Sequence, residues 1–145
     1  MILFSWQLIK MEKKQQLNNY IMIWIYRLLI LLVSGTVYNV WLLRLGKATP
    51  YRGGGATSLQ DEFLVYGLNE QMMYVVGGIK LLASTLLLVG LFRKQLITPA
   101  ATTIAILMIG AIAMHLKVGD PLMRSLPAAM MLLMSIGILR LKKIS

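Results

Sequence analysis

Four long apolar runs constrain the fold of this chain more than any other feature. They cover residues 21–43, 72–92, 97–116 and 122–139 of the 145-residue sequence. At about 1.5 Å rise per residue, each run forms a helix of about 27–35 Å, which matches a hydrocarbon core about 30 Å thick. In lipid only helices and closed barrels satisfy their own backbone, and these runs are too long for barrel strands. The sequence therefore predicts an all-α integral membrane protein, folded as one antiparallel four-helix bundle.

The segments between the runs predict how the helices are connected. Arg93–Gln95 and Gly119–Pro121 are tight turns, so each should join two antiparallel neighbours. Residues 44–71 form a long loop instead, and its stretch at 59–68 mixes polar and apolar residues with a helical period. We expect a short amphipathic helix there, lying at the membrane surface.

The distribution of Lys and Arg predicts the orientation. The N-terminus, the second loop and the C-terminus carry eight of these residues. The other side carries five: four in the long loop and the third loop, and Arg124 near the start of the fourth run. The positive-inside rule then places both termini, including residues 1–20, in the cytoplasm and the long loop outside. The same residues explain the net charge of +10, so the expected partner is the lipid bilayer and not nucleic acid. Whether translation starts at Met1 or at Met11 is left open.

Composition excludes several kinds of chemistry. The sequence has no Cys and one His, so thiol relays, iron–sulfur clusters and His-rich metal sites are not expected. It also contains no GxGxxG, P-loop, CxxC or HExxH motif. We therefore expect no metal, no covalently bound cofactor and no electron transfer by the chain alone.

Polar residues in or next to the apolar runs are the candidate ligand-binding residues, because a charge within a bilayer is costly. These candidates are Lys80, His115, Glu70, Asp120, Arg124, Arg27 and Tyr38. Helical phase places most of them on one stripe of small and polar residues per helix, which we expect to face the bundle interior. Four of them also have a purely structural interpretation: Arg27 and Arg124 could extend to the interface, His115 could cap its helix, and Asp120 could serve only the turn.

Lys80 is the hardest of these to explain structurally. It lies about 12 Å below the outer end of its helix, and no acid occurs at that depth. Its expected partners are hydroxyls, backbone carbonyls, water, or a bound anionic or quinone-like ligand.

The order of several short motifs resembles the DoxX-like family of small four-helix bacterial membrane proteins. The motifs are RLLILLVSG at 27–35, YGL at 66–68, GGIKLLAS at 77–84, ILMIGAIAMHLKVGDP at 106–121 and the pair Pro127–Ala128. One departure is Tyr38–Asn39, where family members often have a basic residue. The resemblance implies a bacterial inner-membrane location and links some members to quinone-coupled sulfur oxidation or to oxidoreductase complexes that resist oxidative stress.

These observations lead to a functional hypothesis with two alternatives. We expect a membrane component of an oxidoreductase system that binds a quinone or a small lipophilic ligand, possesses no catalytic activity alone and works with a protein partner. Lys80 and His115 would donate hydrogen bonds to the ligand, and Glu70 or Asp120 would set their protonation. One alternative is a non-enzymatic scaffold or assembly partner. The other is a small four-helix transporter, which is less favoured because no acid lies in the middle of any run.

Overall fold

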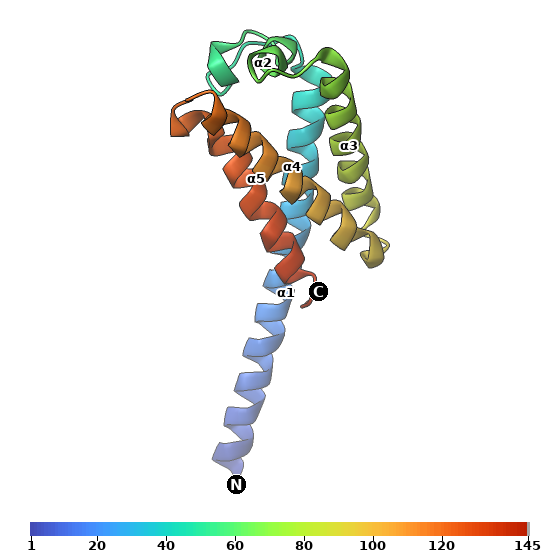
Figure 1. Ribbon diagram of the computed structural model, residues 1–145. Coiled ribbons are helices and arrows are strands. Elements are labelled where there is room, and N and C mark those ends of the chain that lie inside the picture. Colours follow the sequence, from blue (N-terminus) through green and yellow to red (C-terminus); the bar gives the residue numbers. More distant parts are fainter. Residues whose placement is uncertain (145) are drawn as a thin grey trace.

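The structure is a computed structural model that describes residues 1–144 and is built from helices (Figure 1). Four of them are long and apolar enough to cross a membrane. They are α1 (Ile2–Tyr38), which continues into a π-helical turn at Asn39–Leu43, α3 (Glu70–Val89), α4 (Ile97–Lys117) and α5 (Leu122–Leu141). The described residues contain no strand. The predicted all-α four-helix membrane bundle is therefore confirmed.

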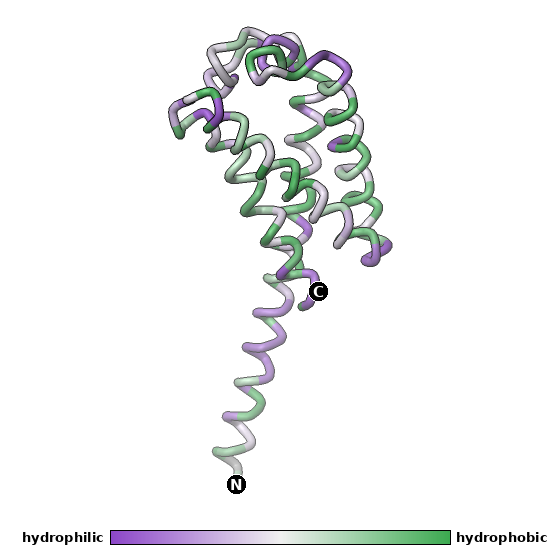
Figure 2. The backbone as a smooth tube through the Cα atoms, viewed as in Figure 1, coloured by the Kyte–Doolittle hydropathy of each residue, from purple (hydrophilic) through white to green (hydrophobic). Residues whose placement is uncertain are grey.

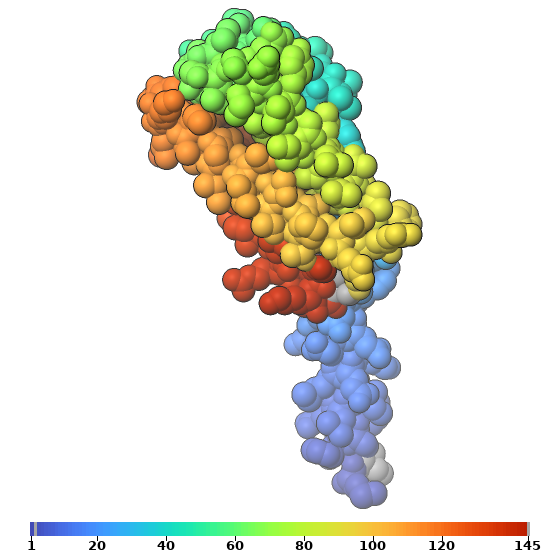
Figure 3. All heavy atoms as spheres, turned by 45° about the vertical axis from the view of Figure 1, so that its right-hand side comes forward, coloured from blue at the N-terminus to red at the C-terminus, as the bar shows by residue number. Residues whose placement is uncertain are grey.

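The first helix is much longer than the apolar run that predicted it. The run starts at residue 21, but α1 begins at Ile2 and projects from the bundle as a continuous rod (Figures 1 and 3). Figure 2 shows a hydrophilic stretch along this rod, which separates its apolar tip from the span. Residues 2–20 thus form a helix where the sequence predicted only a cytoplasmic segment.

Each long helix packs against two others. Helix α1 contacts α3 and α5, and α4 contacts the same two, so the four close into a ring. A 3₁₀ turn at Lys94–Leu96 joins α3 to α4. Gly119, with a φ of 71°, lies just after the end of α4 in the turn to α5, where a left-handed residue with no Cβ is favoured. Both tight turns connect neighbours, as expected.

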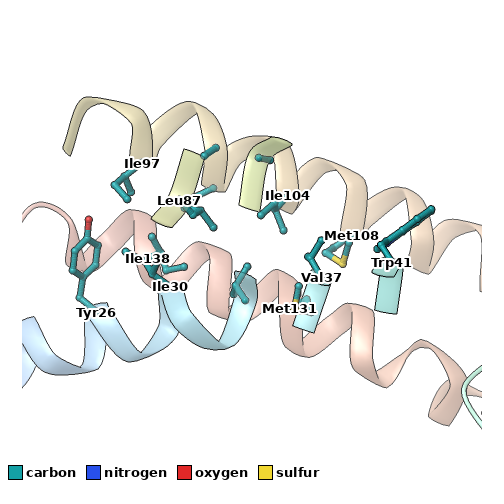
Figure 4. Close-up of a cluster of buried hydrophobic side chains, with 14 of the residues drawn as sticks. Tyr26, Ile30, Val37, Trp41, Leu87, Ile97, Ile104, Met108, Met131 and Ile138 are labelled. Atoms are coloured by element: carbon teal, nitrogen blue, oxygen red, sulfur yellow. The ribbon is translucent and has the colours of Figure 1, made fainter. Parts of the chain in front are cut away.

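The bundle core is a column of large aliphatic side chains from all four helices (Figure 4). Ile30, Leu87, Ile104 and Ile138 are fully buried in it. The predicted inward stripes are confirmed at most positions, and the buried members are Ser34, Trp41, Met73, Gly77, Ser84, Ala101, Ile104, Met108, His115, Met131 and Ser135. Small residues let membrane helices approach closely. One example is the contact of α1 with α3, where the Ser34 hydroxyl donates to the backbone carbonyl of Ser84 at 3.1 Å.

The prediction that Arg27 lies on the inward-facing stripe of α1 was wrong. Its side chain is exposed, and its guanidinium lies 5.4 Å from the centre of the Trp24 ring, which is also exposed. Arg27 therefore faces away from the bundle interior, which fits a residue that extends toward the interface.

The long first loop covers one end of the bundle (Figure 1). It holds a 3₁₀ turn, Gly53–Gly55, and the short helix α2, Leu59–Val65. The Ser58 hydroxyl caps α2 by accepting the N–H of Asp61 at 3.0 Å. Leu59 and Phe63, one turn apart, are buried against the bundle, as expected for an amphipathic helix. We call this end the loop end, and the opposite end, which holds the α3–α4 turn and the end of α5, the turn end.

Candidate functional site

A connected group of polar side chains lies between the long loop and the α4–α5 turn. We call it the loop-end network. Its members are Arg52, Glu62, Tyr66, His115, Asp120 and Arg124. It has two carboxylates, each held by an arginine and by a backbone N–H of the glycine turn, and Tyr66 and His115 lie between them.

The first carboxylate, Glu62, lies on the buried face of α2. It accepts hydrogen bonds from the Arg52 guanidinium at 2.9 Å, from the N–H of Gly53 at 2.7 Å and from the Tyr66 hydroxyl at 3.0 Å. Arg52 is itself 5% exposed and also donates to the carbonyl of Arg44 at 2.8 Å. The charges of this buried ion pair are therefore balanced and hydrogen-bonded within the protein.

The second carboxylate, Asp120, follows the C-terminus of α4. Its N–H bonds back to the carbonyl of His115 at 3.0 Å, which is the pattern of a helix-terminating turn. This turn places the carboxylate 2.8 Å from His115 Nδ1 and 2.6 Å from the guanidinium of Arg124, one turn into α5. The N–H of Gly54 donates to it at 2.9 Å, so Asp120 joins α4, α5 and the loop.

The charge state of Asp120 follows from these contacts. Burial, which leaves the side chain 3% exposed, would raise the pKa of its carboxyl. The hydrogen bonds from His115, Gly54 and Arg124 outweigh burial and lower that pKa below its ordinary value of 3.8. Asp120 is therefore an anion at neutral pH and accepts all three bonds.

Tyr66 and His115 connect the two carboxylates. The Tyr66 hydroxyl lies 3.3 Å from His115 Nδ1 and 3.4 Å from Nε2, and the two rings meet edge to face at 5.7 Å. Burial and the negative charge of Glu62 raise the pKa of Tyr66 well above its usual value. The hydroxyl therefore keeps its proton, which it donates to Glu62.

The glycine turn is needed for this geometry at two positions. A Cβ on Gly53 would collide with the Tyr66 hydroxyl, and Gly54 has a φ of 60°, in the left-handed region. Glycine adopts that conformation without steric cost and exposes its N–H groups to a nearby anion. Here the anions are the protein's own Glu62 and Asp120.

Lys80 makes no hydrogen bond to the loop-end network, although the charge of Glu62 lies close enough to act on its ammonium. Its ammonium is placed 5.2 Å from the centre of the Trp41 ring, and the side chain is half-buried between α1 and α3. Trp41 belongs to the π-helical turn that ends the first span, and a Cβ on Gly77 would collide with its ring. Within the part of the chain that the structure describes, Lys80 Nζ makes no hydrogen bond.

A row of aromatic rings connects Lys80 to the network. Trp41 contacts Phe63 at 6.1 Å between ring centres, Phe63 contacts Tyr66 at 6.4 Å, and Tyr66 contacts His115. The row runs from the cation on α3 to the Asp120 turn. Trp41 and Phe63 belong to the same buried cluster as the bundle core.

The structure brings together three of the seven predicted site residues, His115, Asp120 and Arg124. Glu70 is exposed and accepts a hydrogen bond from Tyr74 at 3.1 Å, so it does not reach His115 or Lys80. The Tyr38 hydroxyl bonds to Thr85 Oγ1 at 2.6 Å on the α1–α3 face. These two residues and Arg27 are therefore separate from the network.

Comparison with known proteins identifies the chain. The family model described as the DoxX-like family matches residues 31–137, which include the whole loop-end network and Lys80. This protein belongs to the DoxX-like family. The search of curated proteins and the search of solved structures found no match.

The loop-end network of this DoxX-like protein balances its charges internally. The positive charges of Arg52 and Arg124 offset the negative charges of Glu62 and Asp120. Close polar contacts join Glu62, Tyr66, His115 and Asp120 in that order. Together with the two ion pairs they hold the loop over the bundle.

Three members of the network were missed as site residues from the sequence: Arg52, Glu62 and Tyr66. Two signals pointed to them. Glu62 and Tyr66 are four residues apart, which puts both on one face of a short helix. Arg52 directly precedes three glycines, a composition that favours a turn whose N–H groups bind an anion.

Proposed function

We propose that this DoxX-like protein is a membrane component of an oxidoreductase system in the bacterial inner membrane. In this proposal it binds a quinone, or a lipophilic ligand with a similar carbonyl, at Lys80. Both termini would lie in the cytoplasm and the loop end would face outward, as the excess of Lys and Arg at the turn end favours.

The environment of Lys80 is the observation that carries the proposal. A cation within a membrane span is costly unless it is paired or serves a function. The ammonium lies over the face of Trp41, which stabilises a cation but accepts no classical hydrogen bond. The ammonium therefore has donors free for the carbonyl oxygen of a ligand.

Two structural features next to Lys80 support a preformed binding site. Trp41 is positioned by a π-helical turn, a distortion that often marks functional sites. Gly77, one turn before Lys80, leaves the space that the Trp41 ring occupies. We no longer propose that His115 binds the ligand, because its Nδ1 bonds to Asp120 and its side chain is buried. Lys80 would bind the ligand, while His115 holds the loop above it.

Quenching of Trp41 fluorescence by a soluble quinone analogue tests the proposal. Trp6→Phe and Trp24→Phe first remove the other two tryptophans. In this background we expect saturable quenching, and Lys80→Met should weaken binding about tenfold or more, as loss of a charged hydrogen bond of about 1.5–3 kcal/mol implies. Arg27→Met is the matched control, because it removes a charge from the lipid-facing side of a span. Equal affinity of the Lys80→Met and control proteins would contradict the proposal.

A second candidate function, a scaffold or assembly partner for another membrane protein, also rests on a specific observation. The loop-end network uses its polar groups on one another, and the projecting part of α1 exposes Leu3, Phe4 and Trp6. This function predicts that a protein partner co-purifies and that Lys80→Met is tolerated. Loss of the system's activity in Lys80→Met with the complex intact would contradict the scaffold and favour the ligand site.

A further inference from the structure

A basic cavity opens at the turn end, on the opposite side of the bundle from the loop-end network. Its volume is about 370 Å³. The first turns of α4 and the end of α5 form its walls, and Figure 3 shows these two segments side by side, in gold and red. Its lining residues are Thr98, Thr102, Leu139, Lys142 and Lys143.

The lining combines cationic and hydroxyl donors with one apolar wall. Lys142 Nζ donates to the Thr98 hydroxyl at 2.6 Å, which holds the ammonium at the mouth of the cavity. Thr102 lies one turn further along α4, on the same face as Thr98. Lys143 is exposed beside them, and Leu139 lies one turn deeper along α5, toward the membrane.

The electrostatics of this end favour an anion. The first turn of α4 has no acidic residue and no side-chain cap, so the positive end of the helix dipole is not neutralised. Lys94 and Arg140 add two more cations at the turn end. The five acids of the chain lie elsewhere, in the projecting part of α1 or at the loop end: Glu12, Asp61, Glu62, Glu70 and Asp120.

We propose that this cavity binds the phosphate of an anionic phospholipid from the leaflet that meets the turn end. Lys142, Lys143 and the two threonine hydroxyls would bind the phosphate oxygens, and an acyl chain would run along Leu139. Basic pockets between membrane helices are suited to acidic headgroups. The site shares no residue with the one proposed at Lys80, so the two proposals can be tested independently.

Native mass spectrometry of the full chain tests the site. The protein, in neutral detergent, is titrated with phosphatidylglycerol and separately with phosphatidylcholine. We expect wild type to retain phosphatidylglycerol in preference to phosphatidylcholine. Lys142→Gln with Lys143→Gln should reduce that preference at least about fivefold, because both ammonium groups that would bind the phosphate are lost. Lys143→Gln alone, which keeps the bond between Lys142 and Thr98, should reduce it about threefold or more.

Lys13→Gln with Lys14→Gln is the control, because it removes the same charge from the projecting helix. An equal loss of preference in this control would overturn the proposal, since it would show a general charge effect. Inorganic phosphate is the second probe. Displacement of phosphatidylglycerol by millimolar phosphate would show that the cavity takes free phosphate and would overturn the assignment to a lipid, whereas retention supports it.

Discussion

Single residues show two different ways in which this chain accommodates charge at a membrane. In the loop-end network every carboxylate has an arginine and a backbone N–H as partners. Lys80 has an aromatic ring and no hydrogen-bond acceptor among the described residues. We therefore expect the network to stabilise the fold and Lys80 to bind a ligand.

Asp120→Asn tests the contribution of the network to stability. The substitution keeps the shape of the side chain but removes the charge that Arg124 and His115 bond to. We expect a loss of about 3 kcal/mol, the lower end for breaking a buried ion pair, because Arg124 is 29% exposed. Unfolding of the purified protein in detergent measures it. The control is Glu70→Gln, an exposed acid whose loss should change stability by less than about 0.5 kcal/mol.

The lowered pKa of Asp120 also predicts how stability depends on pH. A carboxyl with a lower pKa in the folded state stabilises the fold fully above its unfolded pKa, near 3.8, and loses this contribution as the pH falls through the folded value. The melting temperatures of wild type and Asp120→Asn should therefore differ at pH 7 and converge as the pH is lowered below about 4. A constant difference across that range would show that the carboxylate is not stabilised by its partners.

At the scale of elements, α1 and α3 form the contact that places Lys80. Two neighbouring glycines of α3 offer a matched pair of tests. A Cβ on Gly77 would collide with the Trp41 ring, whereas a Cβ on Gly78 meets nothing within 4 Å. Gly77→Ala should destabilise the bundle by about 1–3 kcal/mol through overpacking and shift the emission of Trp41. Gly78→Ala should be neutral or slightly stabilising. Equal effects of the two substitutions would disprove the close contact.

The elements also show what the sequence could predict. The apolar runs predicted four helices, and helical phase predicted the buried sides of α4 and α5, because a long helix in a bundle keeps one face inward. Arg27 was placed wrongly because it lies at the edge of the α1 buried face, about 70° from its centre near Ile30 and Val37. At that edge the short Ser34 fits against α3, while the long arginine side chain points outward.

The long-range contacts of the loop-end network were beyond prediction from local pattern. Gly54 and Asp120 are 66 residues apart, and Tyr66 and His115 are 49 apart. Residues 44–58 have no hydrophobic period that would fix where they fold back. His115, Asp120 and Arg124 were predictable as a group because a single tight turn joins their helices.

At the scale of the whole molecule, the excess of Lys and Arg at the turn end favours the proposed orientation, with the loop end facing outward. The chain has no Cys, so a single introduced Cys is a unique reporter. Gln60 and Gln95 are exposed at opposite ends. In intact cells an impermeant maleimide should label Gln60→Cys, and it should label Gln95→Cys only after permeabilisation. The reverse pattern would show that the loop end faces the cytoplasm.

We propose that Lys80 forms a ligand site within the bundle. Photo-crosslinking with an azido-quinone, followed by mass spectrometry of the labelled peptides, would locate that site. We expect labels on the α3 segment around Lys80 and on the Trp41 turn, competed by unlabelled quinone and lost in Lys80→Met. Labels spread over the lipid-facing side around Arg27, or unchanged in Lys80→Met, would contradict it.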